Sequence, residues 1–214
     1  MKLPVGVSDF RKIVKGNYVF TDKTLLIKDV MNDGADIILI TRPRRFGKTL
    51  NLSMLYYFFD HLQAKDENLF EELNIGQDKA FCEEHQHKYP VIFVSFKDVK
   101  KSSYEDAYAN ILVLVREVYS QHRYLLEGNC LNEDEKDMFN ALLYKTAHQS
   151  ELETSLKQLC AYISRYYGKN PIILMDEYDT PIQEAYLEKY YEKMVELMRG
   201  ILGQALKDNS YLTK

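Results

Sequence analysis

Three short, almost uninterrupted runs of apolar residues punctuate the chain, at residues 37–40, 91–96 and 172–175. Each run is rich in β-branched or aromatic side chains, and Pro90 and Pro171 precede the second and third. Short runs of this kind are typical of strands that are buried on both faces of a sheet. We therefore expect a strand at each of these places.

Between and after these runs, apolar residues recur at three- and four-residue spacing, which predicts helices with one buried face. A serine or asparagine followed three residues later by glutamate marks several helix starts, and Gly168 is a candidate helix stop. Strands that alternate with helices predict an α/β fold with a mainly parallel sheet. The expected helices run from residue 48 to about 62, begin at the pairs Ser102 with Glu105, Asn132 with Glu135 and Ser150 with Glu153, and end with an apolar stripe from Leu187 to Leu202.

The composition fits one globular domain. The 214 residues are 46% apolar and 28% charged, and the net charge of −4 gives no general reason to expect nucleic-acid or membrane binding. No apolar run approaches the roughly 20 residues of a membrane span, and the charged N-terminal stretch lacks a signal-peptide core. The cysteines are widely spaced without a Cys-x-x-Cys, which favours reduced thiols. We expect a cytoplasmic protein with no membrane partner.

The first sign of chemistry is the sequence Gly47-Lys48-Thr49, where the first expected strand ends and a helix begins. A phosphate-binding loop requires this context, because the N–H groups at a helix start and the helix dipole favour an anion. Lys48 would reach the β- and γ-phosphates, the Thr49 hydroxyl would ligate Mg²⁺, and Gly47 would let the backbone approach the phosphate. Arg42, however, replaces the first glycine of the general Gly-x-x-x-x-Gly-Lys-[Ser/Thr] pattern. The motif alone therefore also fits a helix start with a solvated lysine.

Two carboxylates, Asp176 and Glu177, follow the third expected strand. Ligands of open α/β sheets bind at the carboxyl ends of strands, where one carboxylate can hold Mg²⁺ and its neighbour can polarise the attacking water. An Asp-Glu pair alone could equally begin a loop or cap a helix. Because each motif ends an expected strand, the two motifs together indicate a nucleotide site.

Longer stretches of the chain support this interpretation. Residues 41–54 read TRPRRFGKTLNLSM and residues 175–182 read MDEYDTPI, with shorter matching stretches at 6–10, 21–24 and 90–97. In these stretches the chain resembles the bacterial AAA-ATPase-like family, whose members often carry a C-terminal PD-(D/E)xK nuclease-like domain. The RPRRFGKT form is usual in that family, so Arg42 departs from the general loop but not from the family.

The resemblance implies a P-loop NTPase three-layer sandwich with a mainly parallel sheet, and it implies ATP and Mg²⁺ as cofactors. It makes the Gly-Lys-Thr loop a Walker A motif and the Asp-Glu strand a Walker B motif. Carried over residue by residue, the resemblance makes Lys48 and Thr49 the phosphate and Mg²⁺ residues, Asp176 the metal-associated carboxylate and Glu177 the catalytic one. With the residues of the loop added, the expected nucleotide-binding residues are Arg44, Phe46, Gly47, Lys48, Thr49 and Leu50, the expected metal ligands are Thr49 and Asp176, and the expected catalytic residues are Glu177 and, slightly favoured over Arg44, Arg45.

Arg44 and Arg45 lie inside the loop that would wrap the phosphates. A guanidinium there could bind phosphate oxygens with two hydrogen bonds, or act as an arginine finger on the transferring phosphoryl group. Alternatively, both arginines pair with carboxylates such as Asp22 or Asp179 and shape the loop. Because the basic cluster is short, we do not expect this chain to bind nucleic acid directly.

In ATPases of the implied class, a further strand follows the Asp-Glu strand and brings a polar sensor residue beside the P-loop strand. No apolar run that could form it follows the last expected helix. We therefore expect residues 1–214 to be the N-terminal part of a P-loop ATPase-like domain, with a sheet incomplete at its C-terminal end. This chain by itself should then bind nucleotide but turn it over poorly.

Three functions fit these observations. The first is an ATP-binding module that is a Mg²⁺-dependent ATPase in the full-length protein. The second is a nucleotide-gated regulatory module with little hydrolysis that controls an attached nuclease-like effector. The third is a structural α/β module that binds no nucleotide. The expected strands carry no Pro-Asp…[Asp/Glu]-x-Lys set, so the chain itself shows no nuclease centre.

Overall fold

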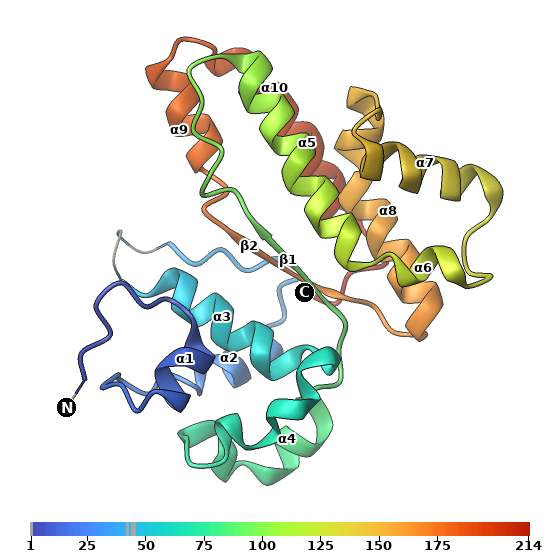
Figure 1. Cartoon of the computed structure of the whole chain (residues 1–214). Coiled ribbons are helices and arrows are strands. Elements are labelled where there is room, and N and C mark those ends of the chain that lie inside the picture. Colours follow the sequence, from blue (N-terminus) through green and yellow to red (C-terminus); the bar gives the residue numbers. More distant parts are fainter. Residues whose placement is uncertain (1, 42, 44–45) are drawn as a thin grey trace. The chain divides into compact units, whose positions relative to one another are not determined.

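The computed structural model describes residues 2–41, 43 and 46–214, apart from the side chains of residues 65–67 (Figure 1). The chain divides into two compact units. Unit 1 comprises Met1–Val91 and Lys214, and unit 2 comprises Ile92–Thr213. The expected phosphate loop therefore belongs to unit 1 and the expected Asp-Glu pair to unit 2.

The sheet of unit 2 has two parallel strands in the described part of the chain, Val91–Ser95 (β1) and Ile172–Asp176 (β2). Just past the end of β1, the Phe96 N–H donates to the carbonyl oxygen of Asp176 at 3.0 Å. β2 is apolar until its last residue and almost wholly buried, as expected for a strand that is covered on both faces. These two expected strands are confirmed.

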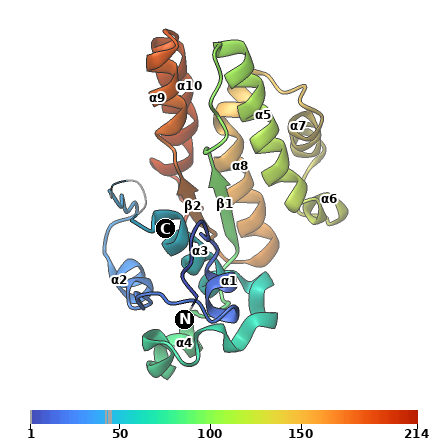
Figure 2. The same cartoon turned by 60° about the vertical axis from the view of Figure 1, so that its left-hand side comes forward.

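The other elements of unit 2 are helices (Figure 2). They are Tyr104–Gln121 (α5), Tyr124–Glu127 (α6), Glu133–Tyr144 (α7), Gln149–Tyr167 (α8), Thr180–Leu187 (α9) and Tyr191–Leu206 (α10). α10 packs against α8 and α9, while α5 packs against α7 and α8. Ile111, Leu156 and Ile201 on their facing sides are fully buried, so these long helices share one core with the strands.

Two of the expected helix boundaries are confirmed. The Asn132 side chain accepts from the Glu135 N–H and the Glu135 carboxylate accepts from the Asn132 N–H, both at 2.9 Å, which is a capping box at the start of α7. Gly168 ends α8 with a left-handed φ of 64°. Both signals are local in sequence, and for that reason the pattern alone identified them.

The other two capping patterns were assigned to the wrong residues. α5 is capped by Ser103, one residue after the predicted cap, and the Ser103 hydroxyl oxygen accepts from the Asp106 N–H at 3.2 Å. α8 is capped by His148, two residues before the predicted cap, with Glu151 bonding back to the His148 N–H at 2.7 Å. Overlapping polar residues offer several caps at the same spacing, and tertiary packing selects one of them.

The predicted last helix is two helices, α9 and α10. Lys189 between them has a left-handed φ of 65°, and the Tyr190 N–H donates to the Ala185 carbonyl oxygen at 3.0 Å. A bond of this kind across a left-handed residue satisfies the carbonyl groups at a helix end. Leu187, expected on the buried stripe, is consequently exposed at the end of α9.

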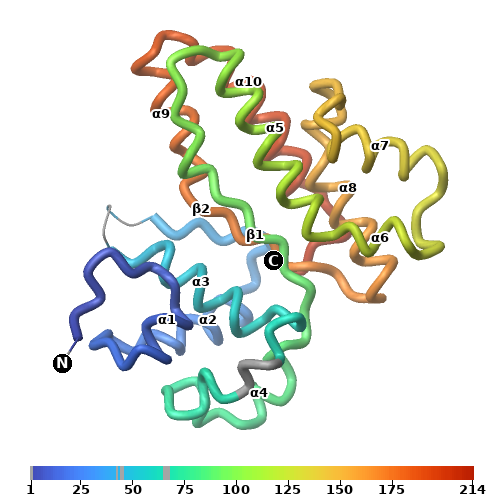
Figure 3. Tube along the Cα trace, in the orientation of Figure 1, coloured from blue at the N-terminus to red at the C-terminus, as the bar shows by residue number. Residues whose placement is uncertain are grey.

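Unit 1 consists of short helices (Figure 3), and aromatic side chains pack in its core. The helices are Phe10–Lys15 (α1), Leu26–Asn32 (α2), Lys48–Phe59 (α3), the 3₁₀ segments His61–Phe70 (η1) and Asn74–Gln77 (η2), and Lys79–His85 (α4). The ring of Phe58 contacts those of Phe70 and Phe81, and Phe10 stacks on Phe70. α3 confirms the expected helix that starts at Lys48, although it ends at Phe59 and gives way to η1.

The expected strand at residues 37–40 is wrong. These residues have no regular secondary structure, and Ile37 and Leu39 are 48% and 63% exposed. A strand needs a neighbour to satisfy its backbone hydrogen bonds, and in the described part of the chain the sheet consists of β1 and β2. The α/β class is confirmed in this coarser form, and the complete P-loop sandwich stays a prediction.

Candidate nucleotide-binding site

The expected phosphate loop leads into a helix start. α3 begins at Lys48, and Gly47 before it adopts a left-handed φ of 77°. A Cβ on Gly47 would meet no atom within 4 Å. Glycine at this position therefore serves the backbone conformation, which a residue with a side chain adopts only with strain.

The N-terminus of α3 differs from that of α7. The first turn of α7 carries Glu133, Asp134 and Glu135, whereas the first turn of α3 has no acidic residue and Gly47 offers no capping side chain. The first N–H groups of a helix lack partners inside the helix, and the helix dipole makes this end positive. α7 thus supplies its own negative charge, while α3 presents an end that suits an external anion.

The described nucleotide-binding candidates lie together at this helix start. Lys48, Thr49 and Leu50 form the first turn of α3 and are half-buried, and Phe46 is exposed just before it. No ion pair holds the Lys48 ammonium within the ranges that the structure describes. The lysine is therefore not committed to a carboxylate there.

The arginines of the loop cannot be compared with their expected roles. Arg42, Arg44 and Arg45 lie outside the described residues, so the roles of Arg44 and Arg45 stay predictions. Both carboxylates that we considered as their partners have hydrogen bonds of their own. Asp22 accepts from backbone N–H groups, and Asp179 accepts from a glutamine amide on α9.

The stretch at residues 6–10 anchors the phosphate-loop helix. The Phe10 N–H donates to the Ser53 hydroxyl oxygen at 3.0 Å, and the Tyr57 hydroxyl donates to Asp9 at 2.7 Å. The Arg11 guanidinium lies 4.2 Å from the centre of the Tyr57 ring. α1 and the residue before it thereby hold α3 in place, a role that sequence reasoning missed because it depends on contacts between distant segments.

The stretch at residues 21–24 has a structural role of the same kind. Asp22 accepts from the Thr24 N–H, the Thr24 hydroxyl and the Asn74 N–H, and the buried Thr24 hydroxyl oxygen accepts from the Ile75 N–H at 3.0 Å. Burial by itself would raise the pKa of Asp22, but the hydrogen bonds from Asn74 and Thr24 hold it below its ordinary value. This network joins the start of α2 to η2.

The two carboxylates of unit 2 lie at the carboxyl end of β2, as expected. Asp176 is the last residue of the strand and is 3% exposed. Glu177 follows it with a left-handed φ of 50°. A residue with a side chain seldom adopts this region, and such conformations gather at functional turns where the surroundings hold them.

The turn after β2 is closed by a residue that sequence reasoning missed. Thr180, at the start of α9, is 6% exposed. Its N–H donates to the Glu177 carbonyl oxygen at 3.0 Å, and its hydroxyl donates to Oε2 of the Glu177 carboxylate at 3.2 Å. In the sequence, the only sign of this contact is that Glu177 and Thr180 are three residues apart. That spacing brings the two side chains together only because the backbone turns at Glu177.

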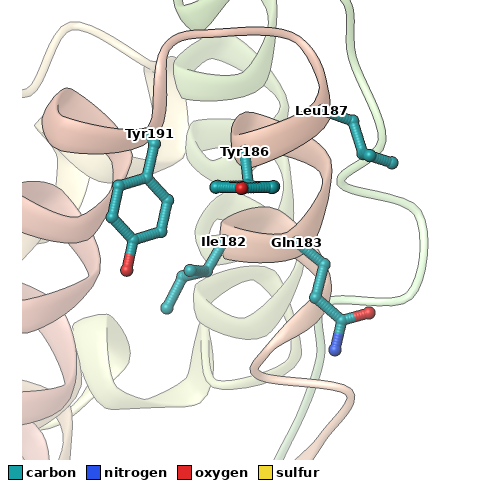
Figure 4. Close-up of a pocket in the computed structure, with 5 residues that line it drawn as sticks. All are labelled: Ile182, Gln183, Tyr186, Leu187 and Tyr191. Carbon is teal, nitrogen blue, oxygen red and sulfur yellow. The ribbon is translucent and has the colours of Figure 1, made fainter.

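A groove of about 440 Å³ lies elsewhere on unit 2, between α9 and the start of α10 (Figure 4). Its lining is mostly apolar and includes none of the expected site residues. A triphosphate needs cationic and N–H donors, so this groove does not suit one. The lining residues are Ile182, Gln183, Tyr186, Leu187 and Tyr191.

The expected metal ligands have suitable chemistry for Mg²⁺. Mg²⁺ prefers oxygen ligands and is usually held by one or two carboxylates together with substrate phosphates and water. The Asp176 carboxylate and the Thr49 hydroxyl are oxygen donors of this kind, and Asp176 is buried at a strand end. The described residues contain no group of three His, Cys, Asp or Glu side chains that could hold a metal by themselves.

Comparison with known proteins adds the family. A curated relative from Azotobacter chroococcum mcd 1, an uncharacterized protein in the vnfD 5′ region, is 29% identical over 182 residues. The match covers 85% of this chain and 30% of the relative, so the chain spans less than a third of that protein's length. No solved structure matches the chain.

The described helices include none with the length and apolar character needed to cross a membrane.

The model of one family matches residues 4–214, which include α3 with its phosphate loop and β2 with its carboxylates. That family is described as predicted AAA-ATPases. The chain belongs to this AAA-ATPase-like family.

Proposed function

We propose that the protein is a Mg²⁺-dependent ATPase that binds the phosphates of ATP at the start of α3. The observation that carries this proposal is the N-terminus of α3, which has Lys48 in its first turn and no acidic residue. Membership of a family described as predicted AAA-ATPases supports it. A solvated lysine at an ordinary helix start would not account for the Asp-Glu pair at the end of β2.

Each of the two motifs has its own task in this proposal. The N–H groups of the first turn of α3 and the Lys48 ammonium bind phosphate oxygens. Thr49 and Asp176 are the residues that would hold Mg²⁺, which when bound neutralises charge on the phosphates. Glu177 accepts a proton from the attacking water while the oxygen of that water bonds to the γ-phosphorus. ADP then leaves with the electrons of the broken P–O bond.

A titration with a fluorescent ATP analogue, with and without Mg²⁺, tests the proposal. Lys48→Ala removes a charge-assisted contact worth about 1.5–3 kcal/mol, so the affinity should fall roughly tenfold or more. Lys207→Ala, at an exposed lysine after α10, is the matched control and should bind like the parent. Equal affinity of the parent and Lys48→Ala would overturn the phosphate-loop assignment.

Phosphate release from the intact protein separates the two nucleotide-dependent functions. Turnover that requires Mg²⁺ and Lys48 is the expected result. Tight binding without turnover would instead favour the nucleotide-gated regulatory module. The attached nuclease-like effector, the cytoplasmic location and the placement of residues 1–214 at the N-terminus of a longer ATPase domain stay predictions.

A further inference from the structure

We propose that Thr180 is a positioning residue that holds the Glu177 carboxylate in the orientation in which it accepts a proton from water. This inference rests on the proposed ATPase function. It deepens the role of Glu177 by naming the residue through which the protein controls it.

The backbone of the turn is the first observation. The chain leaves β2 at Asp176 and turns at Glu177, whose left-handed φ of 50° is unfavourable for a residue with a side chain. Such a conformation persists where the surroundings hold it. The Thr180 N–H does so by donating to the Glu177 carbonyl oxygen at 3.0 Å.

The side chains supply the second observation. The Thr180 hydroxyl donates to Oε2 of Glu177 at 3.2 Å. The other carboxylate oxygen, Oε1, accepts no hydrogen bond within the ranges that the structure describes. One oxygen is thus held by the protein, and the second oxygen is the one that can accept a proton.

Burial makes Thr180 a firm support. Thr180 is 6% exposed, and Pro181 and Ala185 on the same helix are buried as well. A β-branched side chain has few rotamers, so a buried threonine keeps its hydroxyl in one place. A glutamate that is held at one oxygen explores fewer orientations than a free one, which favours the reactive geometry.

The same hydrogen bond could merely close the turn, and the two roles predict different results. Thr180→Val keeps the shape of the side chain and removes the hydroxyl. If Thr180 positions Glu177, this variant should lower kcat about tenfold in the intact protein, since misplacement by about 1 Å can cost a hundredfold. Its affinity for Mg²⁺-ATP should stay within about twofold of the parent, because the hydroxyl donates to Glu177, which the proposal assigns to turnover and not to binding.

Two further variants keep the test decisive. Thr180→Ser retains the hydroxyl and should recover kcat to within about threefold of the parent. In a Glu177→Gln background, Thr180→Val should lower the residual turnover no further, because residues that act through one group are not additive. Thr180→Ala takes the place of the valine variant if thermal unfolding shows that Thr180→Val does not fold.

Each outcome decides the question. Parental kcat in Thr180→Val, or an equal loss of kcat in Thr180→Ser, overturns the inference while Lys48-dependent turnover in the parent leaves the proposed ATPase standing. A further tenfold loss on adding Thr180→Val to Glu177→Gln also overturns it, because the threonine would then act independently of the carboxylate. If the parent shows no Lys48-dependent turnover, the ATPase proposal fails and this inference fails with it.

Discussion

An apolar run precedes each expected site motif, at residues 37–40 and at residues 172–175, but the two runs are built into the molecule in different ways. Ile172–Asp176 (β2) pairs with β1 and is almost wholly buried, whereas residues 37–40 form no strand and leave two apolar side chains largely exposed. Strand formation depends on a partner that satisfies the backbone hydrogen bonds. The carboxylates therefore rely on the tertiary structure of unit 2, while the phosphate loop relies on the local start of α3.

The chain passes through a left-handed residue before Lys48 and again after β2, and the conformational free energy of the two residues differs. Gly47 adopts a φ of 77° without a Cβ, whereas Glu177 adopts a φ of 50° with a full side chain. That region costs a residue with a side chain roughly 1–2 kcal/mol. The left-handed backbone at residue 47 is possible because that residue is glycine. The left-handed backbone at Glu177 is instead held by the hydrogen bond from the Thr180 N–H. ATP binding and ATP turnover should accordingly respond to different substitutions.

The largest expected effect is on turnover. Glu177→Gln keeps the size of the side chain but removes the proton acceptor, so turnover in the intact protein should fall by roughly 10²–10⁴-fold. Phosphate release under saturating Mg²⁺-ATP measures it. Glu188→Gln, on the exposed end of α9, is the matched control and should turn over like the parent. Parental turnover in Glu177→Gln would mean that another group is the base.

The next effect concerns stability and compares the two apolar runs directly. Ile172→Ala removes a buried side chain from β2 and should lower the free energy of unfolding by about 2–5 kcal/mol. Leu39→Ala changes an exposed side chain and should stay within about 0.5 kcal/mol of the parent. Urea denaturation followed by circular dichroism measures both. A loss of several kcal/mol in Leu39→Ala would show that residues 37–40 are packed after all.

A smaller effect should appear in the metal dependence of binding. Asp176→Asn removes the negative charge that would hold Mg²⁺, so the Mg²⁺ concentration needed for half-maximal ATP binding should rise roughly tenfold. Asp134→Asn, at an exposed position on α7, controls for loss of charge. An unchanged Mg²⁺ requirement in Asp176→Asn would remove Asp176 from the metal site.

The smallest effect tests the conformation of the loop. Gly47→Ala places a Cβ on a left-handed residue with open space around it, so only backbone strain of about 1 kcal/mol is added. Gly203→Ala is a suitable comparison, because Gly203 lies inside α10 with equally open space, and alanine there should be neutral or stabilising. Equal changes in the free energy of unfolding for both variants would argue against a strained loop.

The sequence predicted what depends on local rules. The capping box at Asn132, the stop at Gly168 and the start of α3 at Lys48 each follow from a few neighbouring residues, and each is confirmed. The apolar runs predicted the two strands of the sheet, and these strands form because each is buried and paired with the other. The Asp-Glu pair lies at the end of a strand and the Gly-Lys-Thr motif lies at a helix start, as expected, whereas the strand expected before Gly-Lys-Thr does not form at residues 37–40.

Features that depend on distant contacts were missed. The run at residues 37–40 has the composition of a strand, but composition cannot say whether a neighbouring strand is present. The short helices of unit 1 are held by bonds such as that from Tyr57 to Asp9, which no periodicity reveals. Thr180 was overlooked because its contact with Glu177 requires a left-handed turn at a residue that is not glycine.

The decisive experiment is to titrate Lys48→Ala and Glu177→Gln with Mg²⁺-ATP in one series. If binding belongs to the start of α3 and turnover to the end of β2, Lys48→Ala should bind roughly tenfold or more weakly, and Glu177→Gln should bind like the parent. Parental affinity in Lys48→Ala, or an equal loss of affinity in both variants, would contradict this division.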